Sequence, residues 1–137
     1  MQHKVHVFKC RINIILLVLL LFASPVIAGH LYKEKEYQKA WCDERGGIME
    51  YRLDDGTRVD CLLSDVAVEF DFAKKWAESI GQALYYGLKT GRQPAVVLIM
   101  ETPDKDFRHL NRLKVVAKKY NLKIWTIEEP KAASVLR

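Results

Sequence analysis

Residues 48–72, IMEYRLDDGTRVDCLLSDVAVEFDF, decide the fold of this chain of 137 residues. Alternating apolar residues bounded by turn signals predict three strands here, at residues 48–53, 57–63 and 66–72. Asp54-Asp55-Gly56 is a hairpin signal between the first two strands, and Ser64-Asp65 leads into the third. The stretch therefore predicts an antiparallel meander.

The rest of the chain predicts helices and further strands around this meander. Helical periodicity indicates helices at residues 31–45, 74–90 and 104–120, and apolar runs indicate strands at 95–100 and 122–127. The order α-β-β-β-α-β-α-β is typical of an α/β fold with a mixed sheet, in which the second helix makes a parallel crossover. We expect residues 29–129 to form one domain and residues 130–137 to form a tail.

The start of the chain has the features of a cleavable secretory signal peptide. Lys4, Lys9 and Arg11 precede an apolar run at residues 12–23, and small residues then lead to a cleavage site after Ala28. The run is shorter than the roughly 20 residues that a membrane-spanning helix needs. An uncleaved anchor is the alternative. Cleavage predicts a periplasmic or secreted protein without a stable membrane anchor.

Removing this leader changes the charge of the protein. The whole chain carries a net charge of +5, and the leader holds three cationic and no acidic residues. The mature part keeps 19 Lys and Arg against 17 Asp and Glu, a net charge of +2. Such a balance gives no general evidence of a basic nucleic-acid-binding face, so any such function must rest on a site.

Two cysteines remain in the mature part, Cys42 and Cys61, because Cys10 falls in the leader. Disulfides persist in exported proteins, so one intramolecular bridge is expected, with two buried free thiols as the alternative. In the chain-entropy view a bridge across 19 positions stabilises the fold by about 3 kcal/mol.

Acidic residues gather on two neighbouring strands of the meander. Alternation places on one face of each strand the apolar residues Val59, Cys61 and Leu63, and Val68, Phe70 and Phe72. Asp60, Glu69 and Asp71 are left on the opposite face. Side-by-side carboxylates repel unless a cation lies between them, and hard oxygen ligands suit Mg²⁺ or Mn²⁺. The alternative is a solvated strand face.

The helix at 74–90 brings further polar residues to this place. It starts with Lys74 and Lys75, and Glu78, Gln82 and Tyr86 follow at four-residue steps. A lysine there would offset charge on a phosphate, and Gln82 and Tyr86 would orient a phosphate or a water.

The order of elements, together with three short motifs, resembles the PD-(D/E)XK nuclease superfamily, in particular its RecB-like branch. Gly56-x-x-x-Asp60 resembles the first motif, Glu69-Phe70-Asp71 stands at the second, and Gln82-x-x-x-Tyr86 resembles the third. The resemblance covers about residues 31–101 and implies a restriction-endonuclease-like fold with the core order α-β-β-β-α-β.

The resemblance also implies roles for individual residues. Asp60, Glu69 and the Phe70 carbonyl would hold Mg²⁺ or Mn²⁺, and a glutamate of the first helix, Glu34 or Glu36, would assist. Asp71 stands where the family has a lysine. Lys74 or Lys75 would replace that lysine, or Asp71 would serve as a third metal ligand or a base.

Three functions are compatible with this pattern. The first is an exported metal-dependent nuclease that hydrolyses phosphodiester bonds of nucleic acid. The second is a catalytically inactive binding module with the same fold, in an envelope or DNA-transfer assembly. The third is a structural envelope protein. Cation binding separates the first from the third, and cleavage separates the first from the second.

Overall fold

The structure, a computed structural model, describes residues 29–130 and 132–134. The predicted signal peptide, residues 1–28, lies outside the described residues. Among the helices that are described, none combines the length and apolar character needed to cross a membrane.

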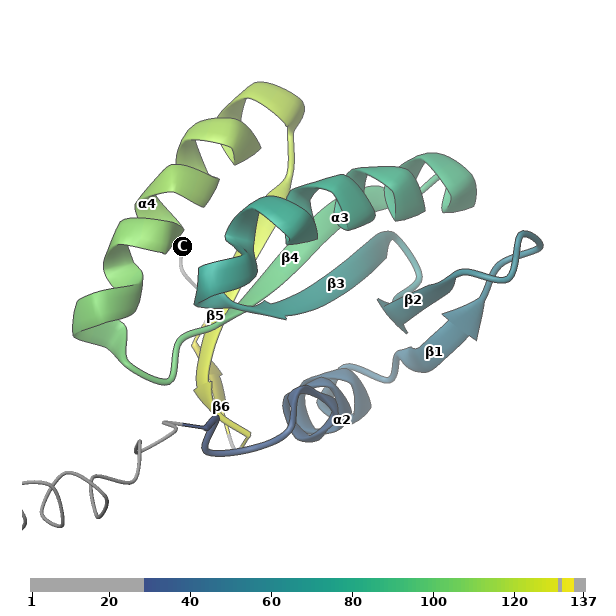
Figure 1. Ribbon diagram of the computed structural model, residues 1–137. Coiled ribbons are helices and arrows are strands. Elements are labelled where there is room, and N and C mark those ends of the chain that lie inside the picture. The colour runs from purple at the N-terminus through teal and green to yellow at the C-terminus, as the bar shows by residue number, and fades with distance from the viewer. Residues whose placement is uncertain (1–28, 131, 135–137) are drawn as a thin grey trace, which may run out of the picture.

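A six-stranded mixed sheet forms the centre of the molecule, and its strands follow one another in chain order (Figure 1). The strands are β1 (Ile48–Arg52), β2 (Arg58–Leu62), β3 (Val66–Phe72), β4 (Gln93–Ile99), β5 (Lys123–Glu129) and β6 (Ala132–Ser134). β1, β2 and β3 pair antiparallel, as the hairpin signals predict. β3 pairs parallel with β4, and β4 with β5, because a helix connects each pair.

Helices cover both faces of this sheet (Figure 1). α2 (Glu34–Glu44) lies on one face, and α3 (Trp76–Thr90) and α4 (Pro103–Tyr120) lie on the other. Beneath α2 the residues Tyr37, Trp41 and Phe70 pack in one core. Beneath α3 and α4 a second core contains Ala83 and Leu113. Residues 95–99 of β4 are all apolar because they contribute side chains alternately to the two cores.

These elements confirm the predicted order and the mixed α/β fold. Differences lie at the ends of elements. The second helix begins as a 3₁₀ turn, η1 (Ala73–Lys75), before α3 starts at Trp76. It ends at Gly91, whose φ of 66° is the left-handed conformation that glycine adopts without strain.

The predicted tail contains the short strand β6. β6 pairs antiparallel with β5, with Ala133 opposite Ile127. Without β6, β5 would be an edge strand with open main-chain hydrogen-bonding groups, and a three-residue strand satisfies part of that edge. A segment this short shows no alternation in the sequence from which it could be predicted.

A disulfide links the first helix to the meander, as expected. Cys42 of α2 and Cys61 of β2 are bonded and fully buried in the core beneath α2. The turn between α2 and β1 passes directly over the bridge at Gly47. A Cβ atom at Gly47 would lie 2.5 Å from the Cys61 sulfur and 2.6 Å from the Cys42 sulfur, so only glycine fits there without a shift.

A second connection joins α2 to the end of β4. The Glu101 carboxylate accepts hydrogen bonds from the Tyr37 hydroxyl at 2.9 Å and from the backbone N–H of Leu31 at 2.8 Å. It also lies 2.8 Å from Nδ1 of His30, whose ring stacks on Phe72. Glu101 therefore fixes the segment that leads into α2.

Candidate functional site

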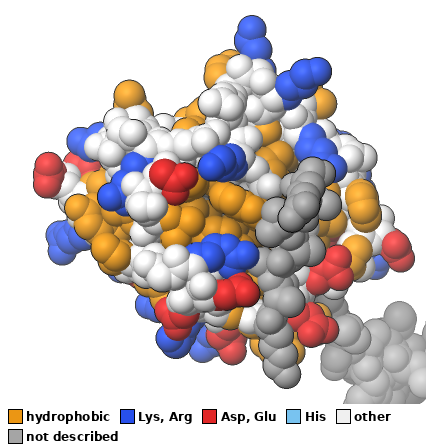
Figure 2. All heavy atoms as spheres, turned by 180° about the vertical axis from the view of Figure 1, so that it is seen from behind, with side chains coloured by type: hydrophobic (Ala, Val, Ile, Leu, Met, Phe, Trp, Pro, Cys, Tyr) orange, Lys and Arg blue, Asp and Glu red, His pale blue; other side chains and the backbone are white. Residues whose placement is uncertain are grey.

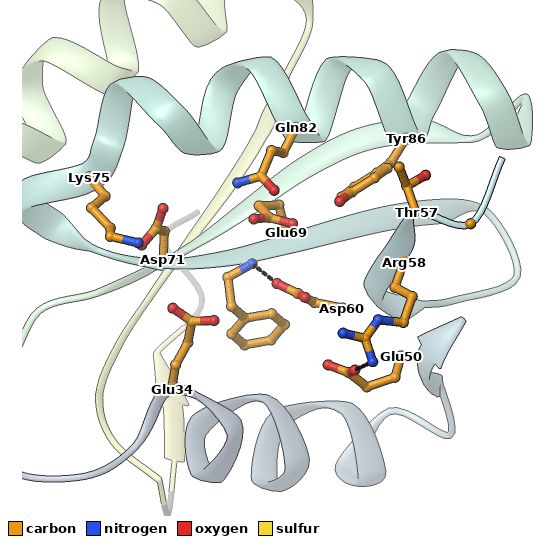
Figure 3. Close-up of a pocket in the computed structure, with 12 residues that line it drawn as sticks. Glu34, Glu50, Thr57, Arg58, Asp60, Glu69, Asp71, Lys75, Gln82 and Tyr86 are labelled. Atoms are coloured by element: carbon orange, nitrogen blue, oxygen red, sulfur yellow. Dashed lines mark hydrogen bonds and ion pairs between the residues drawn. The ribbon is translucent and has the colours of Figure 1, made fainter. Parts of the chain in front are cut away.

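One pocket gathers most of the predicted site residues (Figure 3). Its volume is about 450 Å³. It opens where β2 diverges from β3 and is bounded by α2 and α3 (Figure 3). It is lined by Glu34, Glu50, Gly56, Thr57, Arg58, Asp60, Glu69, Phe70, Asp71, Lys75, Gln82 and Tyr86. The meander and the helix after it therefore do place these groups together.

The pocket exists because the pairing between β2 and β3 is short. Two residue pairs join these strands, Cys61 with Val68 and Leu62 with Ala67, whereas seven pairs join β3 to β4. Beyond Cys61 a side chain takes the place of main-chain pairing between β2 and β3. Asp60 Oδ2 accepts a hydrogen bond of 2.8 Å from the Phe70 backbone N–H.

β1, the strand next to β2, has an irregular backbone beside Asp60. The register of β1 and β2 sets Glu50 across from Asp60, and Glu50 has a φ of 52°. Positive φ is uncommon for residues other than glycine. The Glu50 carboxylate forms an ion pair of 2.9 Å with Arg58. The predictions did not include Glu50, although the Asp54-Asp55-Gly56 hairpin register pointed to it.

This irregularity also changes which residues share a face of β2. Cys61 and Leu63 pack in the core beneath α2, whereas Val59 packs with Leu62 and Tyr86 in a small separate cluster. The prediction that Val59 shares a face with Cys61 is therefore wrong. Strict alternation holds only as far as the ladder, which ends at Cys61.

Asp60, which is half-buried, and Glu69, which is buried, form a carboxyl pair at the base of the pocket. Glu69 is 5% exposed, and its Oε2 is a buried atom without a hydrogen-bond partner. Burial raises the pKa of Glu69 far above its usual range, and the charge of Asp60 raises it further. Burial also raises the pKa of Asp60, although the hydrogen bond from the Phe70 N–H lowers it. The pair therefore favours a shared proton or a cation over two free charges.

Asp71 and Lys75 lie beside this pair. Asp71 is 2% exposed, and burial raises its pKa to about 7, although Lys75 lowers it. The Lys75 ammonium is 3.7 Å from Asp71 and 3.8 Å from Glu78. Lys75 is therefore the lysine that faces the pocket. Lys74 points elsewhere, into a depression that it shares with Lys105 and Arg108.

The first helix contributes one of its two candidate glutamates. Glu34 lines the pocket, and burial raises its pKa. Glu36 turns back instead, and its carboxylate accepts a 2.7 Å hydrogen bond from the Lys33 backbone N–H at the start of α2. Of the two candidates, the structure places Glu34 at the pocket.

Gln82 and Tyr86 lie one turn apart on α3 and both face the pocket (Figure 3). Tyr86 is buried, and burial raises its pKa to about 12, so its hydroxyl stays protonated at neutral pH. Gln82 is exposed, with its amide directed over Glu69 (Figure 3). The four-residue spacing predicted this placement correctly.

The pocket carries an excess of acidic groups, with five carboxylates against two cationic side chains. No three or more His, Cys, Asp or Glu side chains of residues 29–130 are grouped so that they could hold a metal ion. A divalent site here would therefore use two carboxylates, main-chain oxygen and water, which is the usual environment of Mg²⁺.

The Phe70 carbonyl fits that requirement. In an extended strand the N–H and C=O of one residue point to the same edge. The Phe70 N–H points toward β2, where it meets Asp60, so the carbonyl faces the same interruption of the ladder. Together with Asp60 and the unpartnered Glu69 Oε2, it forms a set of hard oxygen donors.

No protein-family model matches the chain, and neither a curated protein nor a solved structure matches it.

Proposed function

We propose that this chain is an exported, metal-dependent nuclease that hydrolyses phosphodiester bonds of nucleic acid, with a PD-(D/E)XK-like, restriction-endonuclease-like fold and a periplasmic or secreted location. The observation that carries the proposal is the Asp60–Glu69 carboxyl pair, with the buried and unpartnered Glu69 Oε2, in a pocket that also contains a lysine. The disulfide supports export, because such bridges persist in oxidising compartments.

In this proposal Asp60, Glu69 and the Phe70 carbonyl hold Mg²⁺ or Mn²⁺. When bound, the ion would activate water and neutralise charge on the scissile phosphate. The same burial that makes the pair costly as free carboxylates makes a cation there favourable.

The other pocket residues have roles that follow from their protonation states. Lys75 offsets negative charge that develops on the phosphate. Asp71, whose pKa is raised to about 7, accepts a proton at neutral pH, as a general base does. The protonated Tyr86 hydroxyl donates a hydrogen bond, and the Gln82 amide orients the phosphate.

Substrate would be held at the site rather than by a broad basic surface. The mature part has a net charge of only +2. On the side shown in Figure 2, basic and acidic side chains are interspersed with hydrophobic ones.

The test is cleavage of labelled single- and double-stranded DNA and RNA in Mg²⁺ or Mn²⁺. Glu69→Ala should abolish cleavage and Lys75→Ala should reduce it. Lys74→Ala is the matched control, because this neighbouring lysine lies outside the pocket, and it should cleave normally. No cleavage of any substrate by the folded protein would overturn the proposal.

A catalytically inactive binding module is the second candidate. It is favoured by Asp71 at the position of the family's lysine, and by the ion pairs that occupy Lys75. This candidate predicts that the protein binds Mn²⁺, and that Glu69→Ala abolishes the binding, while cleavage is absent throughout.

A further inference from the structure

We propose that the Cys42–Cys61 disulfide is a positioning device for the candidate site: it holds Asp60 against Phe70, so the oxygen donors come together only in the oxidised chain. The inference rests on the proposed function for its metal and its substrate. Its geometric part can be tested without either.

The bridge joins the two elements that bring Asp60 and Glu34 to the pocket. Cys61 is the residue after Asp60 on β2, and Cys42 lies in α2, the helix that begins with Glu34. The bond therefore ties together two elements that supply carboxylates to the pocket.

Cys61 is also the last residue of β2 that pairs with β3 on the side of the pocket. Its partner is Val68, and no backbone pair follows beyond it toward Asp60. Beyond Cys61, the Phe70 N–H donates a hydrogen bond to Asp60 Oδ2, and Asp60 also lies beside the Glu69 carboxyl. The position of Asp60 therefore depends on how firmly Cys61 is fixed.

Other attachments of the hairpin are the buried packing of Val59 against Tyr86, which no covalent bond fixes, and polar contacts at its turn. Asp55 in the turn accepts a hydrogen bond from the Tyr85 hydroxyl, and Lys89 approaches Asp55 at 3.9 Å. These groups are solvent-exposed or partly so, and exposed ion pairs contribute little. The disulfide, in contrast, is fully buried.

Reduction would release this restraint. Two electrons and two protons from a dithiol such as dithiothreitol convert the bridge to two thiols, and the dithiol becomes a cyclic disulfide. In a reducing cytoplasm the chain would keep its two thiols, and its site would remain incomplete until export. The cell's own nucleic acid would then be protected from cleavage before the protein leaves.

The first readout is amide hydrogen exchange, with Phe70 compared to Val97. Both amides lie in the sheet, but only Phe70 donates to Asp60. In Cys42→Ala/Cys61→Ala the protection of Phe70 relative to Val97 should fall at least about tenfold, because a local opening of β2 exposes Phe70 alone. Cys42→Ala/Cys61→Val, which restores side-chain volume without a bond, should behave alike. Sucrose keeps destabilised variants folded during the measurement.

Leu113→Ala is the matched control. Leu113 is fully buried in the other core, beneath α4, so this change weakens the fold without touching β2. Its ratio of Phe70 to Val97 protection should equal that of the unmodified protein. A merely stabilising disulfide would give the same ratio in all variants, and that result would overturn the proposal.

The second readout is Mn²⁺ affinity, which should fall at least about tenfold in both cysteine variants and remain unchanged in Leu113→Ala. A lower ratio of Phe70 to Val97 protection in the cysteine variants, together with weaker Mn²⁺ binding, supports the inference. If the ratio falls in the cysteine variants but no form of the protein binds Mn²⁺, the oxidised form included, the positioning role is supported. The proposed function is then overturned instead.

Discussion

The two halves of the molecule are held together in different ways. The hairpin half consists of α2, β1 and β2, and the parallel half of β3, β4, β5, α3 and α4. Seven pairs join β3 to β4 within the parallel half, but two pairs join β2 to β3 across the boundary. The candidate site lies on that boundary, so its geometry depends on the few contacts that cross it.

Contacts that cross the boundary include the Asp60–Phe70 hydrogen bond, the Glu101 hydrogen bonds and the aromatic packing of α2, whereas the disulfide lies within the hairpin half and ties β2 to α2. Trp41 of α2 meets the Phe70 ring edge-on, with centroids 5.5 Å apart. The parallel half thus provides Glu69 and Asp71 to the pocket, and the hairpin half provides Glu34, Glu50 and Asp60. Each of the following changes tests either a contact across the boundary or the bond that holds the hairpin half together.

The largest loss of stability is expected from Phe70→Ala. The ring is 1% exposed and packs against Trp41 across the boundary, so its removal leaves a cavity between the halves. Unfolding in urea should show a loss of about 3–5 kcal/mol. Phe107→Ala on α4, where the ring is 53% exposed, is the control and should change stability by less than about 0.5 kcal/mol.

Removal of the disulfide should have the next largest effect. Cys42→Ala/Cys61→Ala should lower the free energy of unfolding by about 3 kcal/mol, because the bridge restricts the unfolded chain across 19 positions. The measurement is urea unfolding with and without dithiothreitol. If the reductant lowers the stability of the alanine variant as much as that of the unmodified protein, the bridge is not the source of the difference.

Gly47→Ala tests whether the bonded sulfur atoms leave room for a side chain at residue 47. Its Cβ would lie 2.5 Å and 2.6 Å from the two sulfur atoms, so the oxidised protein should lose about 1–3 kcal/mol through overpacking. In the Cys42→Ala/Cys61→Ala background both sulfurs are gone, and the same substitution should cost much less. Equal losses in the two backgrounds would mean that the collision is with other atoms.

The smallest effect is expected at the second connection. Burial raises the pKa of Glu101, but the hydrogen bonds from His30, Tyr37 and two backbone N–H groups outweigh it and lower the pKa. A lowered pKa in the folded state gives stability that is present above the unfolded pKa and is lost as pH falls through the folded one. Glu101→Gln should therefore cost about 1–2 kcal/mol at pH 7.

That difference should shrink as the pH is lowered toward 3, because protonation removes the charge that Glu101→Gln also removes. Urea unfolding of both proteins between pH 7 and pH 3 measures it. A difference that is independent of pH would show that the Glu101 charge is not what holds residues 30–32.

Much of the fold could be predicted because its signals are local. The Asp54-Asp55-Gly56 turn sets the hairpin register, and alternation in β3 places Glu69 and Asp71 opposite Phe70. Gln82 and Tyr86 share a face of α3 because four residues make about one helical turn. Each of these relations depends on a few neighbouring residues.

The parts that could not be predicted depend on small rotations or on tertiary pairing. Lys74 and Lys75 are adjacent, and which one faces the pocket depends on the 3₁₀ turn that precedes α3. Val59 leaves the expected face because the ladder between β2 and β3 ends at Cys61. β6 forms because β5 has an open edge, a property that residues 130–137 do not carry themselves.

The close approach of Gly47 to the disulfide also predicts which positions should vary together in homologous chains. Gly47, Cys42 and Cys61 form a steric unit, since the glycine has no room for a side chain while the two sulfurs are bonded beneath it. Homologous chains that keep both cysteines should therefore keep the glycine, whereas in those that have lost the cysteines only the flexible Leu63 side chain, 2.8 Å from such a Cβ, would have to shift. Glycine at this position together with both cysteines would be the sequence signature of a chain that keeps this bridge.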